Sequence, residues 1–397
     1  MGKCLRTVMR LNLVILYFIE NAFGLHTVRS DRVGVKLRCK WFIITVAKWS
    51  WPLAILALGS SSYAFSVLFY KGLVFGVEQK YLKQSISLVI VWLLNLFVAL
   101  VVYMRQLVDG DKIDELNKDF EKLVEQYSGS SVIEFQRLKG LVLLLTYEAA
   151  TLVVLWLNIN PTYRFYSGHD WFLSVAVMAP ITIRSLLVTR YCVNFSSVGR
   201  IVRELNRELS IRVRRFHRMQ AKPNISFHTL TNIELKLTDH LDGLIIQYDR
   251  MHDVVMAIIE IYSPSILFVL VLDFGQMTFE MYMLYCDLAH TSLDSDDLHT
   301  VIFSLVSAVL SFLEIAFVVD GTSKYTVGLE ESIEWLQRIG IHCIDGRLAK
   351  SVATLSQLCN RAHGDVISFY YFALDRSFLM TIIAASCSYL ILLIQTV

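Results

Sequence analysis

Long apolar windows separated by polar segments run along the whole chain. The second and sixth windows lack the alternation of apolar and polar residues that is typical of a strand, which favours helices. Windows of roughly 20 apolar residues can cross a hydrocarbon core of about 30 Å as α-helix, which pairs every backbone group internally. The pattern therefore predicts seven membrane-spanning helices, near Trp41–Phe69, Tyr81–Tyr103, Leu141–Leu157, Trp171–Cys192, Val254–Phe274, Val301–Val319 and Ser377–Val397.

Composition agrees with an all-α polytopic membrane protein. Of 397 residues, 55% are hydrophobic and 18% are charged, and the mean hydropathy is +0.51, which excludes an ordinary water-soluble domain. The first residues, MGKCLRTVMRLNLVILYFI, resemble a secretory signal in having basic residues before a short apolar run. Cleavage after that run would leave a basic stretch, Arg29 to Lys40, on the outer face. We therefore interpret the run as an interfacial helix on the cytoplasmic side.

The distribution of Lys and Arg predicts the orientation, because these residues are retained in short cytoplasmic loops. With the N-terminus inside, the cytoplasmic segments hold 29 Lys and Arg residues and the outer loops hold four. The loop after the fifth window holds only acidic charges, beginning with Glu280, and is predicted to lie outside. The chain is thus predicted to have a cytoplasmic N-terminus and an extracellular C-terminus, opposite to a G-protein-coupled receptor.

Two polar inner segments carry apolar residues at helical spacing and are therefore predicted to be helical. Such stripes need partners. Either they extend the membrane helices and pack on one another, or they join four subunits. The stripes are Ile113, Leu116, Phe120, Leu123, Val124 and Tyr127 in the first segment, and Ile233, Leu237, Leu241, Leu244, Ile245 and Tyr248 in the second.

The last window carries the most specific signal in the sequence. It contains Ser388-Tyr389, then five apolar residues, then Gln395, and it is preceded by Leu374-Asp375-Arg376-Ser377. This ending resembles the C-terminal signature of insect gustatory receptors, which is Thr-Tyr, five hydrophobic residues and Gln-Phe. Ser388 keeps the hydroxyl of the family's Thr, whereas Thr396 does not keep the aromatic ring. The close motif covers about 25 residues, and segment count, orientation and length match the family over the whole chain.

Small or polar residues in this window lie on one helical face. Close helix packing through small residues explains such a face, and a pore lining explains it equally. The resemblance favours the pore, because in that family the last helices of four subunits line a central channel. It implies that Gln395 is the selectivity residue and Ile391 or Ile394 the hydrophobic gate, with Tyr389 packed behind. The face consists of Ser377, Thr381, Ala384, Ser388 and Gln395.

The resemblance also implies a ligand pocket that opens outward among the first six helices. Candidate lining residues are Trp156, Trp171, Tyr262 and Asp273, because aromatic rings stack on ligands and a carboxylate pairs with a cation. The alternative is that both Trp residues are interfacial anchors and Asp273 lies in water. Four further charges fall inside predicted spans, Glu148, Arg184, Glu260 and Glu314, and we expect a Glu148–Arg184 ion pair.

Other protein classes find little support. The sequence has no GxGxxG, Walker, HExxH or clustered His/Cys motif, so we expect no enzyme, catalytic residue, metal or cofactor. Five Pro and no repeats argue against a transporter. The expected function is a gustatory receptor that acts as a ligand-gated, non-selective cation channel for a bitter or aversive tastant. An odorant-receptor channel and a G-protein-coupled receptor are the alternatives.

This interpretation divides the chain into four parts. They are a cytoplasmic segment 1–40, helices one to six at 41–319 with the ligand pocket and cytoplasmic extensions, a cytoplasmic tetramer anchor 320–376, and the pore helix 377–397. Expected partners are a small-molecule tastant, cations, membrane lipid and other gustatory subunits in a homo- or hetero-tetramer, with no nucleic acid. The expected location is the plasma membrane of sensory neurons.

Overall fold

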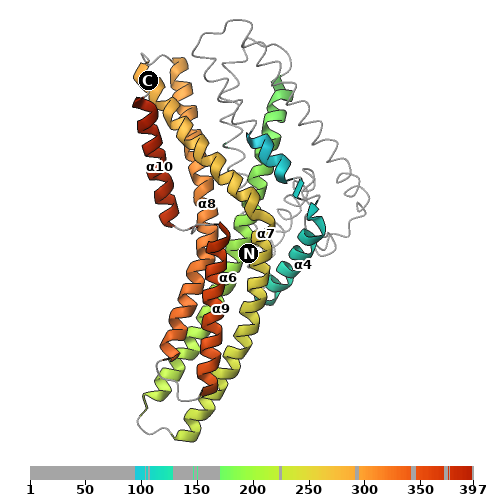
Figure 1. Cartoon of the computed structure of the whole chain (residues 1–397), viewed down its shortest axis with the longest axis vertical. Coiled ribbons are helices and arrows are strands. Elements are labelled where there is room, and N and C mark those ends of the chain that lie inside the picture. The colour runs from blue at the N-terminus through green and yellow to red at the C-terminus, as the bar shows by residue number, and fades with distance from the viewer. Residues whose placement is uncertain are drawn as a thin grey trace, which may run out of the picture.

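The computed structural model describes residues 94–102, 104–105, 108–127, 146, 150, 170–222, 226–290, 295–340, 346–370, 374 and 376–395. Every regular element within these ranges is an α-helix, which confirms the predicted all-α class. Figure 1 labels six helices. They are α4 Gly110–Tyr127, α6 Asp170–Gln220, α7 Phe227–His290, α8 Ser295–Gly340, α9 Gly346–Tyr370 and α10 Arg376–Gln395.

Three of the predicted windows fall wholly inside these helices. The fourth, fifth and sixth windows lie in α6, α7 and α8, residues 377–395 of the seventh window lie in α10, and residues 94–102 of the second window are helical. The first window lies outside the described residues, as does the third apart from residues 146 and 150. By length and composition, Phe227–Cys286 and Ser304–Ile339 are long and apolar enough to cross a membrane, and their most apolar 18-residue stretches have mean hydropathies of 2.3 and 1.8.

The helices continue well beyond their apolar windows. Helix α7 has 64 residues, which at 1.5 Å per residue is about 96 Å, roughly three times a hydrocarbon core. Glu280 was predicted to lie in an outer loop, but it is a buried helical residue of α7. The predicted loop was wrong. The apolar window ends before this acidic residue, but the helix continues, because the Ser307 hydroxyl of α8 donates to Glu280 at 3.4 Å and so accommodates the carboxylate.

The polar extensions of α6, α7 and α8 pack with α9 into a four-helix bundle that fills the lower half of Figure 1. The second predicted stripe lies in this part of α7, where Leu237, Leu241, Leu244 and Tyr248 are buried. This confirms that the stripe extends a membrane helix. The first stripe lies on α4, whose buried residues Ile113, Leu116, Phe120 and Leu123 face α6 and α7.

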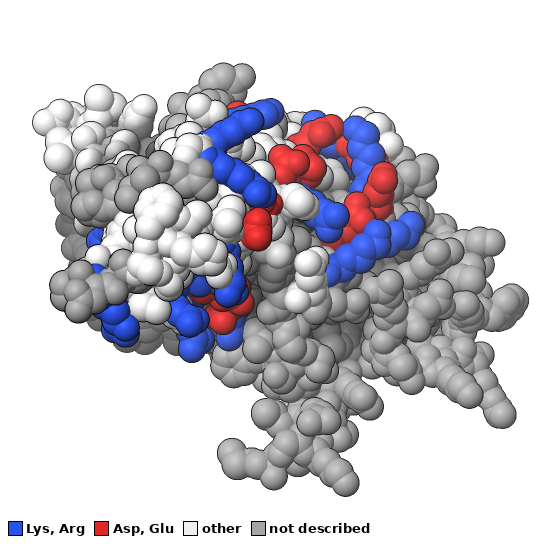
Figure 2. All heavy atoms as spheres, turned by 90° about the horizontal axis from the view of Figure 1, so that it is seen from below, with Lys and Arg blue, Asp and Glu red and all other residues white. Residues whose placement is uncertain are grey.

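The lower end of the bundle is highly charged. Figure 2 shows it from below, with Lys and Arg mixed among Asp and Glu side chains. Arg212, Arg214 and Arg215 of α6 are exposed, and Arg347 of α9 lies 3.4 Å from Asp239 and 3.2 Å from Asp242 of α7. Charges of both signs therefore cover this end of the bundle.

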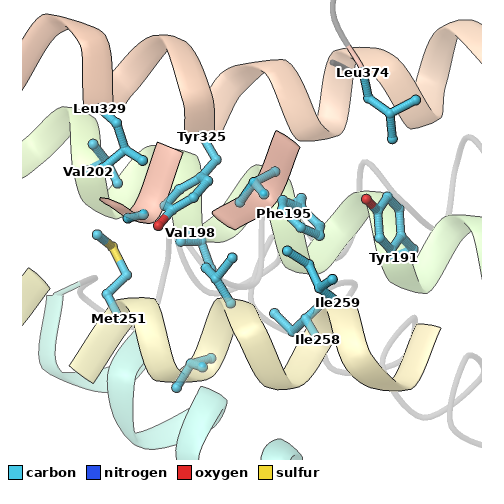
Figure 3. Close-up of a cluster of buried hydrophobic side chains, with 14 of the residues drawn as sticks. Tyr191, Phe195, Val198, Val202, Met251, Ile258, Ile259, Tyr325, Leu329 and Leu374 are labelled. Carbon is cyan, nitrogen blue, oxygen red and sulfur yellow. The ribbon is translucent and has the colours of Figure 1, made fainter. Parts of the chain in front are cut away.

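An aromatic and aliphatic core joins α6, α7 and α8 at the middle of the molecule. Figure 3 shows Tyr191 and Phe195 of α6 near Ile258 and Ile259 of α7, with Tyr325 of α8 on the other side. The Tyr191 and Phe195 ring centroids are 4.7 Å apart. All five side chains are fully buried. Within a bilayer such a core is stabilised by close van der Waals packing, because lipid tails are as apolar as the side chains themselves.

A buried polar network lies just below that core. The Asn206 side-chain amide donates to the Gly328 carbonyl oxygen at 2.7 Å, and the Tyr248 and Ser332 hydroxyls donate to Asn206 Oδ1 at 3.1 and 2.6 Å. Burial raises the pKa of the Tyr248 hydroxyl above its usual value, which keeps it protonated and able to donate. One asparagine thus links α6, α7 and α8.

Helices α6 and α8 approach so closely that two contact positions must be glycine. A Cβ at Gly199 would lie 2.9 Å from the Lys324 backbone carbon, and one at Gly328 would lie 2.8 Å from Val202 Cγ1. Backbone atoms cannot move aside as a flexible side chain would. The absence of a side chain at Gly199 therefore sets the distance between the two helices.

We predict that Gly199→Ala destabilises the protein, because the added Cβ overlaps the α8 backbone and overpacking costs about 1–3 kcal/mol. The melting temperature of the detergent-solubilised protein should fall, as followed by fluorescence-detected size-exclusion chromatography. The matched control is Gly243→Ala, where a Cβ meets nothing within 4 Å. This variant should be neutral or more stable, because Ala favours helix by roughly 1 kcal/mol over Gly. Equal melting temperatures for the two variants would contradict the close-contact explanation.

Candidate functional site

Helix α10 has one face packed against the protein and one face open. It packs on α7 and α8, with Ile382 and Ser386 buried at the contact. The predicted pore face lies on the open side, where its five residues are all exposed: Ser377, Thr381, Ala384, Ser388 and Gln395. In the part of the chain that the structure describes, the side chains of this face are therefore exposed on the side of α10 that points away from α7 and α8.

The two candidate gate residues differ in position. Ile391 is 57% exposed and lies between Ser388 and Gln395 on the open face, whereas Ile394 is partly covered. Tyr389 lies beside that face. Its ring is 55% exposed and meets the Phe274 ring of α7 edge-on, with centroids 6.1 Å apart. Of the two candidates, Ile391 is therefore the one that lies on the open face of α10.

A second polar feature lies inside the helix bundle, where four buried side chains from different helices meet around Arg184. Arg184 Nη1 donates to Asn95 Oδ1 at 2.9 Å and lies 3.4 Å from Asp273 Oδ1. Arg184 Nη2 donates to Glu314 Oε2 at 2.7 Å. All four residues are at most 3% exposed. This charge cluster, Asn95, Arg184, Asp273 and Glu314, joins α6, α7 and α8 to the second predicted span.

The charge cluster has more acidic than basic groups. Within the described residues it contains two carboxylates and one guanidinium, and neither Asp273 oxygen accepts a hydrogen bond there. Taking ions out of water costs several kcal/mol each, which only close pairing offsets. The shorter Arg184–Glu314 contact is thus the principal pair, and Asp273 is held by proximity alone. This arrangement leaves Asp273 as the most easily perturbed member of the cluster.

Sequence analysis found Arg184 and Glu314 as costly membrane charges but did not pair them. The expected partner of Arg184, Glu148, lies outside the described residues. A usable signal was present, since Arg184 and Glu314 each lie about 13 residues into a window. Glu260, also expected to be deep, is instead exposed on α7 and pairs with Lys112 of α4 at 3.1 Å.

The other predicted ligand-pocket residues are distributed as follows. Tyr262 is buried on α7, and the Arg190 guanidinium carbon lies 6.0 Å from its ring centroid, within the range of cation–π attraction. Asp273 belongs to the charge cluster and is not in water. Trp171 lies in the first turn of α6, and Trp156 lies outside the described residues. The described residues contain no group of three His, Cys, Asp or Glu side chains able to hold a metal ion.

Comparisons with known proteins agree on one family. A family model described as 7tm Chemosensory receptor matches residues 14–397. The chain is similar in structure to the insect olfactory receptor OR5 from Machilis hrabei in complex with eugenol, with a TM-score of 0.57 and 12% identity over 99% of both chains. A second structure of OR5 gives a TM-score of 0.55 and 11% identity over 97% of this chain and 98% of that one. No curated protein sequence matches this chain. At these identities the structural likeness establishes the shared fold.

We predict that Arg184→Met strongly destabilises the fold, because it leaves two buried carboxylates without their cation, at a cost of about 3–5 kcal/mol. Surface biotinylation and the melting temperature in detergent should both fall. The additional change Glu314→Gln should restore part of the loss. The matched control is Arg207→Met on the same helix, where an exposed pair with Glu204 at 3.6 Å contributes about 0–1 kcal/mol. Similar losses for the two single variants would contradict the assigned role of the cluster.

Proposed function

Because the chain belongs to the 7tm chemosensory receptor family, we propose that it is a gustatory receptor acting as a ligand-gated, non-selective cation channel. The observation that carries this proposal is the open face of α10 that ends in the exposed Gln395 side chain, because an amide is costly to place in lipid. Packed around a common axis, four such faces form a polar channel wall. The charge distribution supports a cytoplasmic N-terminus and an extracellular C-terminus for this helix.

In this proposal α10 supplies both selectivity and gate. Gln395 presents an uncharged ring of amide dipoles at the outer end, and Ser388 lines the wall below it. Ile391, one helical turn before Gln395, closes the pore by excluding water. Ile394 lies to the side, and Tyr389 packs on Phe274 behind the wall. The polar bundle of α6, α7, α8 and α9 is proposed as the cytoplasmic anchor that joins four subunits.

A taste ligand is favoured by the ending of the chain. The Ser388-Tyr389 pair followed by five apolar residues and Gln395 resembles the gustatory signature, and a bitter or aversive compound is proposed as the tastant. Trp156, Trp171, Tyr262 and Asp273 are proposed around its pocket. A ligand with higher affinity for the open arrangement shifts the population toward it, so that cations enter and the sensory neuron depolarises across its plasma membrane.

An odorant-type channel is the second candidate. One observation favours it, namely the likeness to an olfactory receptor over nearly the full length of both chains. The two candidates share pore and fold and differ in the compound that opens the channel. A panel containing bitter alkaloids, sugars and volatile aromatics such as eugenol therefore discriminates between them.

We predict that compounds from this panel evoke whole-cell cation current in cells expressing the chain, even with G-protein signalling blocked. Gln395→Glu should raise the permeability of divalent over monovalent cations, because it places carboxylates at the proposed filter. Reversal potentials in two ionic solutions measure this change. The matched control is Gln357→Glu, an exposed position on α9, which should leave selectivity unaltered. Current abolished by the block would reject a channel in favour of a G-protein-coupled receptor.

We predict that Ile391→Ala raises the current in the absence of any compound, because a smaller side chain weakens the hydrophobic constriction. Ile394→Ala removes the same atoms from a partly covered position and should raise it much less. Both currents are normalised to the amount of protein at the cell surface. A larger effect at Ile394 would assign the gate to that residue.

A further inference from the structure

The side of α10 opposite its open face carries a polar contact with α7. Ser386 is 9% exposed and Thr278 is 8% exposed, and their hydroxyl oxygens are 3.2 Å apart. Each residue belongs to a mostly apolar helix. Between apolar helices, a hydrogen bond fixes the relative orientation of the two helices more closely than apolar packing alone, because it forms only at a restricted distance and angle.

The Thr278 hydroxyl has two acceptors within hydrogen-bond distance. Its Oγ1 lies 2.9 Å from the Phe274 carbonyl oxygen, one turn earlier on α7, and 3.2 Å from Ser386 Oγ, to which it can also donate. Since a hydroxyl has one proton, Thr278 donates either to the carbonyl of its own helix or across to Ser386. Replacing either side chain with an apolar one of similar shape removes the contact between the helices without adding volume.

The same turn of α7 is held on its other sides. Phe274 meets the Tyr389 ring of α10 edge-on, which adds an apolar contact next to the hydroxyl pair. The neighbouring Asp273 lies 3.4 Å from Arg184 of α6. In this part of α7, Asp273 contacts α6, whereas Phe274 and Thr278 contact α10.

We propose that Thr278 and Ser386 are positioning residues that seat the pore helix on α7 and so set the balance between closed and open pore. This inference rests on the proposed channel function. A hydrophobic gate needs side chains that converge within a narrow tolerance, and among the described helices α10 is held in place by its contacts with α7 and α8. Without the Thr278–Ser386 contact, which we call the seat, α10 moves relative to α7 and the constriction at Ile391 widens.

The test is a double-mutant cycle on the full chain. The variants are Thr278→Val, Ser386→Ala and the two combined, and the readout is cation current without added compound, normalised to surface protein. A hydrogen bond between membrane helices is worth about threefold in an equilibrium constant. Each single variant should raise the current about threefold, and the combined variant should raise it no further, because either change alone breaks the contact.

Two control variants separate this role from general loss of structure. Thr278→Ser keeps the hydroxyl and should behave as the wild type. Thr238→Val makes the same substitution at a buried position of α7 whose hydroxyl bonds the Glu234 carbonyl within its own helix, and it should not raise the current. Unchanged or lower current in both single variants would overturn the proposal, as would independent effects that multiply in the double variant.

A cross-linking measurement distinguishes failure of the seat from failure of the channel. Thr278→Cys combined with Ser386→Cys should form a disulfide under mild oxidation, detected by mass spectrometry of the linked peptides whether or not current flows. If the link forms in the double variant while the wild-type chain passes no current with any panel compound, the contact stands and the channel function is rejected, and with it the gating role. No link in a protein that conducts would reject the seat and leave the channel function standing.

Discussion

The close parallel contact between α6 and α8 is the constraint on which the other features of the structure depend. Gly199 and Gly328 permit it by having no side chain, and the Asn206 amide bonded to the Gly328 carbonyl fixes how far one helix is shifted along the other. Partners along this interface are always 122 to 131 residues apart, from Arg184 with Glu314 through Tyr191 with Thr322 to Asn206 with Ser332. One register therefore brings the buried charges, the aromatic core and the polar network together.

That register also explains why charged residues are tolerated deep in the bundle. An isolated Arg or Glu in a hydrocarbon environment is costly, and the cost falls only when a partner is held at hydrogen-bond distance. The α6–α8 contact supplies such a partner in Glu314, and α7 adds Asp273 beside it. Asp273 is followed directly by Phe274, whose ring meets Tyr389 of α10, so the charge cluster lies next to the contact between α7 and α10.

Helix α10 differs from the other helices in how it meets its surroundings. The hydroxyls of α10 do not all face the same way. Ser386 is buried against Thr278 of α7, whereas Thr381, Ser388 and the Gln395 amide lie on the open face. The Thr381 and Ser388 hydroxyls bond carbonyl oxygens of their own helix, so the Gln395 amide is the principal polar group of this face. The open face is the basis of the proposal that neighbouring copies complete the subunit.

The sequence alone predicted most of the described features that depend on the order of apolar and polar residues, although it ended the fifth helix too early, before Glu280. It predicted the all-α class, the windows within α6, α7, α8 and α10, the stripes of α4 and α7, and, through the ending at Gln395, the family. These features can be predicted one segment at a time, because helix periodicity and the length of apolar helix needed to cross a bilayer do not depend on which helices are neighbours.

Contacts between helices were decided by the tertiary structure. The continuation of α7 past Glu280, the choice of Glu314 and Asp273 as neighbours of Arg184, the need for glycine at position 199 and the Thr278–Ser386 contact all depend on which helix faces which. Depth in a window can be estimated from position along the chain. Lateral neighbours cannot, because many arrangements of the same helices satisfy the same hydrophobic pattern, and only close packing with paired polar groups selects one of them.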